Sequence, residues 1–152
     1  MTTPEVVELT PDETHPLRLA VLRFDTPTKE VVFPEDTWPG AVHLGLRLDG
    51  ELVATSSWVP RPAPTSGADE EGPAVQLRGM ATARHLQGGG WGGVLLEAGC
   101  ARHAADGRAL VWARARDNAL AFYLRHGFQV EGDGFVDEHT QLPHHLIVRR
   151  LT

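Results

Sequence analysis

Hydrophobic and polar residues alternate most regularly over residues 42–48, which the dipeptide Asp49-Gly50 separates from a second predicted strand at residues 52–59. Alternation with a period of two is typical of a strand with one buried face, and Asp-Gly favours the tight turn of a β-hairpin. Gly79 interrupts a further apolar stretch and predicts a β-bulge there. In all, the pattern predicts additional strands at residues 6–9, 74–82, 109–115, 128–132 and 144–151.

Three segments have the pattern of helices, at residues 17–24, 90–105 and 117–127. Each is bounded by residues that favour helix ends: a Thr-Pro pair before the first, an Asp-Gly pair after the second, and a glycine after the third. Residues 26–40 and 61–73 are rich in proline and predict loops. The order of elements predicts one mixed sheet covered by helices, in a single domain over residues 1–152.

Composition narrows the function classes. A chain of 152 residues that is 41% hydrophobic can bury one core. Its formal net charge of −6 and its single lysine exclude the basic footprint of a nucleic-acid-binding protein. No apolar stretch approaches the ~18 residues that a membrane span needs, and the N-terminal residues lack a leader pattern, so we expect a cytoplasmic protein without a membrane partner. The single Cys100 excludes a disulfide framework and a cysteine-based zinc site.

Five glycines occur within six residues at the start of the second helical segment, at positions 88, 89, 90, 92 and 93. Glycine in a helix costs roughly 0.5–1 kcal/mol relative to alanine, so the cluster indicates a place where a ligand approaches the backbone closely. A helix N-terminus offers free N–H groups and the positive end of the helix dipole, which together bind phosphate. A flexible surface loop is the simplest alternative.

Two nucleotide-binding motifs match these glycines poorly. Gly88, Gly90 and Gly93 satisfy G-x-G-x-x-G, the fingerprint of a dinucleotide-dependent oxidoreductase. That fingerprint follows a strand directly and requires an acidic residue at the end of the next strand, whereas residues 83–87 intervene here and Asp106 lies in a turn. A Walker A loop is excluded, because no Lys-Ser or Lys-Thr follows the glycines.

The same loop also reads Q-x-x-G-x-G from Gln87 to Gly92. With LRGMAT before it and VLLEAG after it, this segment resembles the coenzyme A binding loop of the GNAT superfamily of N-acetyltransferases. NALAFYLRHGF, at residues 118–128, resembles the second motif of that superfamily, N-x-x-A-x-F-Y-x-x-x-G-F. Further blocks, LRLAVLR, VVFPEDTWPGAVHLG and LPHH, extend the resemblance over essentially the whole chain. It implies an α/β (α+β) fold with a mixed, mostly antiparallel sheet of six to seven strands flanked by helices.

The resemblance implies an acetyl-CoA-dependent N-acetyltransferase that acts on a primary amine of a small molecule or an amino-acid-like acceptor. Backbone N–H groups of residues 87–93 would hold the pyrophosphate, and a strand at residues 80–82 would diverge from its neighbour to hold the pantetheine arm. Asn118 would also contact the coenzyme, although it equally fits a helix N-cap. The implied coenzyme contacts are Met80, Ala81, Thr82, Gln87, Gly88, Gly89, Gly90, Trp91, Gly92, Gly93, Asn118, Phe122 and Tyr123.

Two residues are candidates for proton transfer. Tyr123 stands at the family position for the acid that protonates the leaving thiolate, and a phenol of pKa ~10 stays protonated at neutral pH. An aliphatic ammonium must lose a proton before attack, and His144 in the last strand is our candidate for the general base. A metal site formed by His139, His144 and His145 conflicts with the alternation of a strand, which places adjacent side chains on opposite faces, so we expect no metal.

The resemblance places the first helix and the following loop at the acceptor pocket, so the candidate acceptor contacts are Arg18, Phe24, Phe33 and Trp38. Arg18 would bind an acceptor carboxylate or form a surface salt bridge. The alternative function is a non-catalytic module that binds acyl-CoA. The sequence leaves open the identity of the acceptor, the length of the acyl group, and whether the protein is a monomer or a homodimer.

Overall fold

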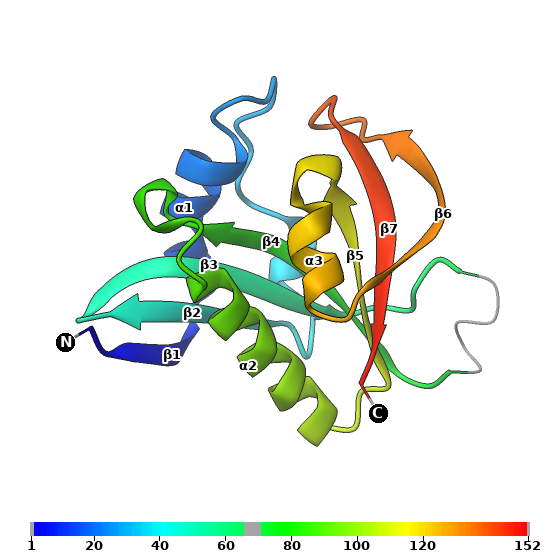
Figure 1. Ribbon diagram of the computed structural model, residues 1–152, viewed down its shortest axis with the longest axis horizontal. Helices are drawn as coiled ribbons and strands as arrows, with labels where there is room; N and C mark the ends of the chain where they lie inside the picture. Colours follow the sequence, from blue (N-terminus) through cyan, green and yellow to red (C-terminus); the bar gives the residue numbers. More distant parts are fainter. Residues whose placement is uncertain (1, 66–70, 152) are drawn as a thin grey trace.

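The computed structural model describes residues 2–65 and 71–151. Seven strands form one sheet in the order β1-β2-β3-β4-β5-β7-β6 (Figure 1). Every neighbouring pair is antiparallel except β4 and β5, which confirms the mixed, mostly antiparallel sheet. The strands are β1 (Pro4–Leu9), β2 (Val42–Leu48), β3 (Glu51–Pro60), β4 (Ala74–Thr82), β5 (Leu110–Arg116), β6 (Gln129–Val136) and β7 (Pro143–Arg150).

The first helical region differs from its prediction at residues 17–24. It is a succession of short 3-10, α and π segments rather than one α-helix, and Pro16 within it lacks the N–H that a regular helical ladder needs. The second and third helices lie where the sequence predicts them. The helical elements are η1 (Pro11–Thr14), α1 (His15–Leu17), the π-helical η2 (Arg18–Leu22), η3 (Pro34–Thr37), η5 (Arg84–Leu86), α2 (Trp91–Ala105), η6 (Asp117–Ala119) and α3 (Leu120–Arg125).

The hairpin and the bulge predicted from the sequence are both present. Strands β2 and β3 pair from Val42 with Trp58 to Leu48 with Glu51. In the β3–β4 ladder, the register shifts between Thr55 and Ser57, so that β4 carries one extra residue there. Gly79 has a φ of 59° within this bulge, which confirms its predicted position.

Strands β4 and β5 pair over only three residues at one end. Ala74–Gln76 pair with Leu110–Trp112, and beyond this point the two strands diverge. Residues 77–82 of β4 therefore have no strand partner on the side facing β5, among the residues that the structure describes. We call the diverging region, residues 77–82 of β4 and 113–116 of β5, the wedge.

The two faces of the sheet carry separate apolar clusters. On one face, Trp58, Val111 and Ile147 pack with α2 and α3. Trp58 reaches α2 through Gly99, where an added Cβ would lie 2.0 Å from the indole. On the other face, Trp112 and Val148 form a smaller cluster. Alternation along β5 and β7 assigns each side chain to one face, and we call the face without α2 the open face.

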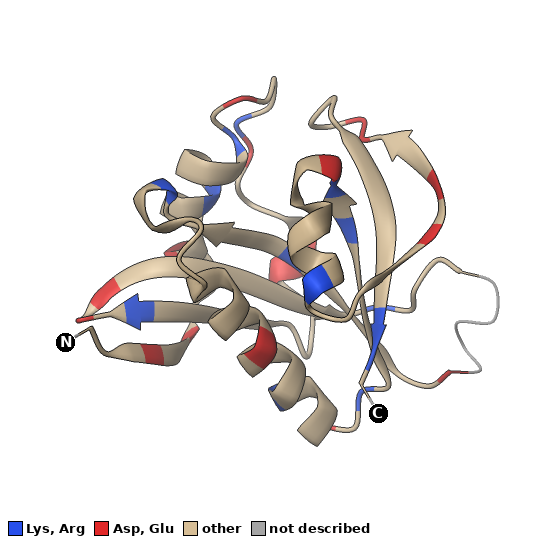
Figure 2. Cartoon of the chain, viewed as in Figure 1, with Lys and Arg blue, Asp and Glu red and all other residues tan. Residues whose placement is uncertain are grey.

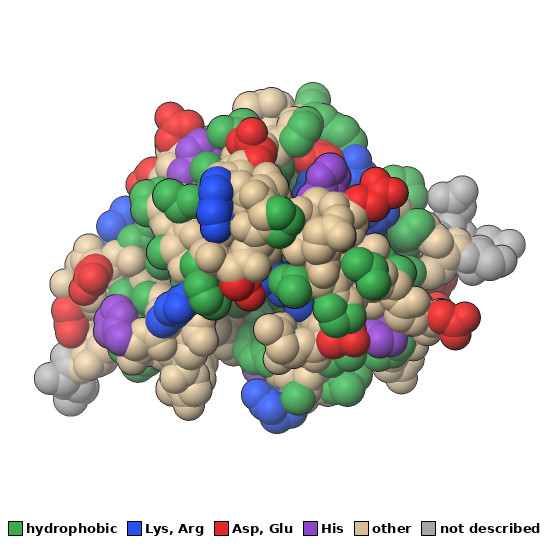
Figure 3. Space-filling model, turned by 90° about the horizontal axis from the view of Figure 1, so that it is seen from above, with side chains coloured by type: hydrophobic (Ala, Val, Ile, Leu, Met, Phe, Trp, Pro, Cys, Tyr) green, Lys and Arg blue, Asp and Glu red, His purple; other side chains and the backbone are tan. Residues whose placement is uncertain are grey.

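Positively and negatively charged residues are interspersed along the strands and helices (Figure 2). The segment after η2 and the β6–β7 connection lie at the same end of the molecule (Figure 1). Figure 3 looks onto this end, where acidic, basic and histidine side chains are mixed. None of the described helices is long and apolar enough to cross a membrane.

Candidate active site

The glycine-rich loop joins β4 to α2 in the position that the sequence predicts. Gly90 is the N-cap of α2 and has a φ of 88°, a left-handed conformation that glycine adopts without strain. Gly92 lies against neighbouring elements, because an added Cβ would be 3.0 Å from Thr82 Oγ1 and 3.7 Å from the Phe122 ring. The loop is therefore held close to both the end of β4 and α3.

Several N–H groups at the start of α2 are free to bind an anion. In the described part of the chain, the N–H groups of residues 88, 90, 91, 92 and 93 have no acceptor. Two members of the predicted set differ: Gln87 N–H donates to the Arg84 carbonyl, and Gly89 N–H donates to the Leu86 carbonyl. Five donors and the positive end of a helix dipole form a binding site suited to a pyrophosphate.

Gln87 has a structural role that the motif alone does not reveal. Its side-chain Nε2 donates a hydrogen bond of 2.9 Å to the Thr82 carbonyl at the end of β4. The side chain thus ties the glycine loop to the wedge. The predicted contacts Met80, Ala81 and Thr82 lie in the wedge, where β4 has one side without a strand partner among the described residues.

Tyr123 lies on α3, on the face of the sheet covered by α2. Its ring makes edge-to-face contacts with Phe122 and Phe128, at centroid distances of 5.0 and 5.4 Å. No hydrogen-bond partner for its hydroxyl is present in the described residues, although the residue is only 7% exposed. Burial raises the pKa of Tyr123 above its usual value, which keeps the phenol protonated.

Asn118 does not cap α3. It lies inside η6, and the N-cap of α3 is Ala119. Within the described residues, the Asn118 side chain is exposed and makes no hydrogen bond. The N-cap reading is therefore wrong, and the amide is free to contact a ligand.

Arg18 is buried on the open face and does not meet solvent. Its side chain forms a bidentate ion pair with Asp36, at 2.7 and 2.9 Å, and also donates to Ser57 Oγ at 2.7 Å. Ser57 in turn bonds to His43, whose other ring nitrogen lies 3.0 Å from the Asp36 carbonyl. Although burial alone would raise it, the hydrogen bonds and charge of Arg18 lower the pKa of Asp36. Both of the roles predicted for Arg18, acceptor binding and a surface salt bridge, are therefore wrong.

The three aromatic acceptor candidates lie in different surroundings. Phe33 is buried beneath three guanidinium groups, of which that of Arg18 lies 3.9 Å from the ring centroid. Phe24 is 56% exposed and stacks with Arg84. Trp38 stacks with Arg61, which bonds to Gln76 in the paired part of β4, so Trp38 lies away from the open end of the wedge. Of the three, the structure leaves only Phe24 exposed beside the glycine loop.

His144 points to the open face of β7. Its Nδ1 lies 2.8 Å from the Leu142 carbonyl, so this nitrogen carries the proton in the neutral ring and Nε2 is the basic atom. Asp137 lies nearby and interacts with the His144 charge; although burial would raise it, hydrogen bonds from the Thr140 and His139 backbone lower the pKa of Asp137. His145 points to the opposite face, where its ring lies 2.6 Å from Asp117. The two histidines thus lie on opposite faces, as alternation predicts.

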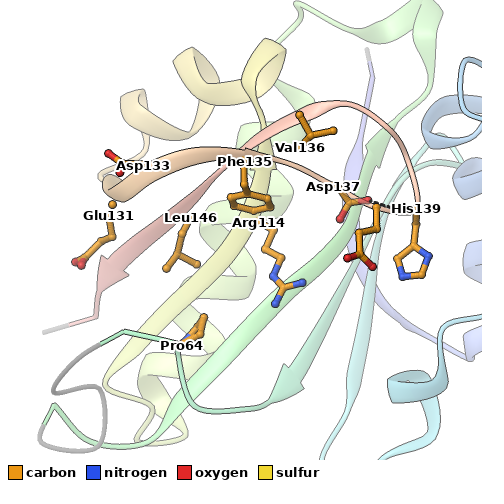
Figure 4. A pocket seen from close by; sticks show the side chains of 11 residues that line it. Pro64, Arg114, Glu131, Asp133, Phe135, Val136, Asp137, His139 and Leu146 are labelled. Carbon is orange, nitrogen blue, oxygen red and sulfur yellow. Dashed lines mark hydrogen bonds between the residues drawn. The ribbon is translucent and has the colours of Figure 1, made fainter.

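A cavity of about 530 Å³ lies on the open face; Phe135, which stacks on His144, lines it, whereas the buried His144 itself does not. Figure 4 shows the side chains of Arg114, Phe135 and Asp137 directed toward this space. The Phe135 ring also stacks on His144, with 5.9 Å between centroids. The described residues contain no group of three or more side chains placed to hold a metal ion.

The family of this chain follows from a match to a family model. The model of the acetyltransferase (GNAT) family matches residues 8–128, most of the chain. The chain belongs to the GNAT family. The matched residues include β4 and β5, which form the wedge, together with the glycine loop, α2 and α3. The fold described above is the GNAT fold.

Among GNAT relatives, the chain is 29% identical over 131 residues to YitI, an uncharacterised N-acetyltransferase of Bacillus subtilis, with 86% of each chain covered. An acyl-CoA N-acyltransferase from Pseudomonas aeruginosa has a similar fold, with a TM-score of 0.72, 21% identity and coverage of 97% and 99% of the two chains. An aminoglycoside 6'-N-acetyltransferase solved with coenzyme A has a TM-score of 0.73 at 12% identity, with 97% of each chain covered.

Four residues of this region were not singled out from the sequence. Arg23, Arg78, Arg116 and Asp137 come from four separate segments, and only the tertiary structure brings them to the open face beside the wedge. Of these four residues, only Arg116 could have been recognised as a candidate from the sequence. It ends the buried strand β5 and lies just before the second GNAT motif.

The buried ion pair generates a prediction about stability. Asp36→Ala leaves the Arg18 charge buried without its partner, and we expect the free energy of unfolding to fall by about 3–5 kcal/mol in chemical denaturation. Glu8→Ala, which removes the exposed partner of Arg102, is the matched control and should change stability by less than about 1 kcal/mol. Equal effects of the two substitutions would contradict a central role for the buried pair.

Proposed function

We propose that this chain is an acetyl-CoA-dependent N-acetyltransferase whose acceptor is a primary amine of a small or amino-acid-like molecule. One observation carries the proposal. The glycine loop connects β4, whose residues 77–82 have no strand partner on one side in the described structure, to the free N–H groups at the start of α2. Candidate acid and base groups, Tyr123 and His144, lie on opposite faces of the sheet beside this wedge. The family membership and the coenzyme A present in one structural neighbour support the same reading.

The residues present fit the coenzyme. Residues 88 and 90–93 supply the N–H donors for the pyrophosphate, and residues 80–82 supply backbone groups for the amide-containing arm. Asn118 and Phe122 line the approach from η6 and α3. When bound, acetyl-CoA supplies an acetyl group activated as a thioester, which an amine attacks with departure of a thiolate.

Tyr123 supplies the proton for the leaving sulfur in this proposal. Its phenol is protonated at working pH, because burial raises its pKa, and its hydroxyl makes no hydrogen bond within the described part of the chain. A protonated phenol donates readily to a thiolate, whose conjugate acid has a pKa of ~8.5. Cys100 is unsuited to a competing nucleophilic role, because burial raises the pKa of its thiol to about 11.

His144 accepts the proton of the acceptor ammonium, directly or through a water molecule. The bond from Nδ1–H to the Leu142 carbonyl orients the ring and leaves Nε2 as the basic atom. Asp137 stabilises the imidazolium that forms, since its own carboxylate is held in the ionised state by backbone N–H groups. This arrangement favours an enzyme over a binding module that holds acyl-CoA without turning it over.

A direct test is release of free thiol from acetyl-CoA across a panel of primary amines. Amine-dependent release, with the N-acetyl product identified by mass spectrometry, is the expected result. Tight binding of coenzyme A in calorimetry without turnover of any amine would instead support the non-catalytic acyl-CoA-binding module. Binding of NAD(P) in place of coenzyme A would support the dinucleotide alternative.

Tyr123→Phe keeps the ring contacts with Phe122 and Phe128 but removes the acidic proton. We expect kcat to fall by roughly 10²-fold or more, with little change in the KM for acetyl-CoA. Because the active form is protonated and burial raises the pKa, kcat of the native enzyme should not decline from loss of this proton until above about pH 10. Undiminished turnover by the variant would remove Tyr123 from the mechanism.

Two adjacent histidines offer a matched pair of variants for the base. His144→Gln should lower kcat by roughly 10²-fold, since the side chain on the open face no longer accepts a proton. His145→Gln alters the opposite face of the same strand, beside Asp117, and should retain kcat within about threefold. Steady-state kinetics at saturating acetyl-CoA measures both. Equal losses in the two variants would argue that the effect is structural.

A further inference from the structure

Two guanidinium groups meet at one carbonyl oxygen on the open face. Arg116 Nη2 donates to the Leu22 carbonyl at 2.5 Å, and Arg23 Nη1 lies 3.4 Å from the same oxygen. These residues come from the end of β5 and from the segment that follows η2, so their contact crosses the open end of the wedge.

Both groups retain donors after these contacts. Arg23 Nε bonds to the Glu30 carbonyl at 2.8 Å, whereas Arg23 Nη2 has no partner among the described residues. Arg116 Nη1 forms a long ion pair of 3.7 Å with the partly exposed Asp25 Oδ1, without a hydrogen bond, so this nitrogen can still donate to a further anion. The pair therefore presents N–H groups that can form short, charge-assisted bonds with a planar anion.

The other cations of this region are already neutralised. Arg18 is paired with Asp36, and Arg78 lies 2.5 Å from Glu35. Arg23 is 9% exposed, and its charge is opposed by burial first and then by the neighbouring Arg116 and Arg78, which together lower its pKa. Asp25 and Asp137 are the carboxylates that face the pair, and neither is hydrogen-bonded to it in the described structure. A further anion would relieve this repulsion.

The position of Arg116 relates this anion to the reaction. Arg116 pairs directly with His144 in the β5–β7 ladder, and both side chains lie on the open face. Arg23 also interacts with Asp137, which in turn interacts with His144, so the guanidinium pair and the candidate base lie on the same part of the open face. This placement suits an acceptor that carries both an amine and a carboxylate.

We infer that Arg23 and Arg116 bind a carboxylate of the acceptor, which makes the acceptor an amino acid or a closely similar amino carboxylic acid rather than a simple amine or polyamine. The inference rests on the proposed function and specifies its substrate class. When both arginines donate hydrogen bonds to the acceptor carboxylate, they also orient the acceptor amine toward His144.

The test compares acceptors that differ only at the carboxylate. Sets such as alanine, alaninamide and ethylamine, or phenylalanine, phenylalaninamide and phenethylamine, are assayed for thiol release from acetyl-CoA. We expect kcat/KM for the amino acid to exceed that for its amide and its decarboxylated amine by roughly 10- to 100-fold in at least one set. Equal or better use of the compounds without a carboxylate, across the sets, would overturn the inference while leaving the proposed function intact.

Variants of Arg23 and Arg116 test whether these two residues produce the preference for a carboxylate. Arg23→Gln and Arg116→Gln should each raise the KM for the preferred amino acid by roughly 10- to 100-fold and so reduce the preference over its amide. Arg23→Lys should restore part of the preference, because it keeps the charge. Arg47→Gln, on β2 beside Glu13, is the charge-matched control and should keep the preference. Thermal unfolding of all four variants identifies any that fail to fold, and an unchanged preference in both folded glutamine variants would contradict the assignment.

Calorimetry separates failure of this inference from failure of the proposed function. The same amino acids and amides are titrated into protein saturated with coenzyme A. Carboxylate-dependent binding that is lost in Arg23→Gln supports the site even if no amine is acetylated. Absence of such binding, together with equal turnover of acids and amides, rejects the site.

Discussion

The pairing of β4 with β5 ends after three residues, and the arrangement of the candidate site follows from that interruption. A strand inside a sheet normally has hydrogen-bond partners on both sides, whereas residues 77–82 have them on one side only in the described structure. The bulge at Gly79 lies where the divergence begins, and the Gln87 side chain ties the end of β4 to the glycine loop. The unpartnered strand and the free N–H groups of α2 thus become one continuous binding surface for an extended, phosphate-bearing ligand.

The wedge also separates two chemical environments. On one side of the sheet, α2 and α3 bury Tyr123 among aromatic and aliphatic side chains, which keeps its phenol protonated. On the open face, His144 lies among charged groups, and Phe135, which stacks on it, lines a cavity. In the proposed reaction the acid and the base therefore act from opposite faces, with the reacting atoms between the diverging strands.

On the open face, the buried charges of Arg18 and Asp36 pair with each other. Arg18 and Asp36 neutralise each other away from solvent and hold the segment before β2 against β3 through Ser57 and His43. That anchoring positions Leu22 and Arg23 over the wedge. The chain is acidic as a whole, with a net charge of −6, yet Arg23 and Arg116 form a locally basic site. The net charge of the whole chain therefore does not predict the charge of the ligand that a local site prefers.

The sequence by itself determined the hairpin, the bulge at Gly79, the long helix after the glycines and the family, because each depends on local periodicity, turn chemistry or a contiguous motif. It also predicted that His144 and His145 lie on opposite faces, since strand alternation is local. Only the tertiary structure decided which arginine is buried in a bidentate ion pair and which retain N–H donors for a ligand. Arg18, Arg23 and Arg116 are indistinguishable as letters, and their roles depend on whether Asp36, Leu22 or His144 lies beside them. Such contacts join positions distant in the chain, so they become visible only once the sheet has formed.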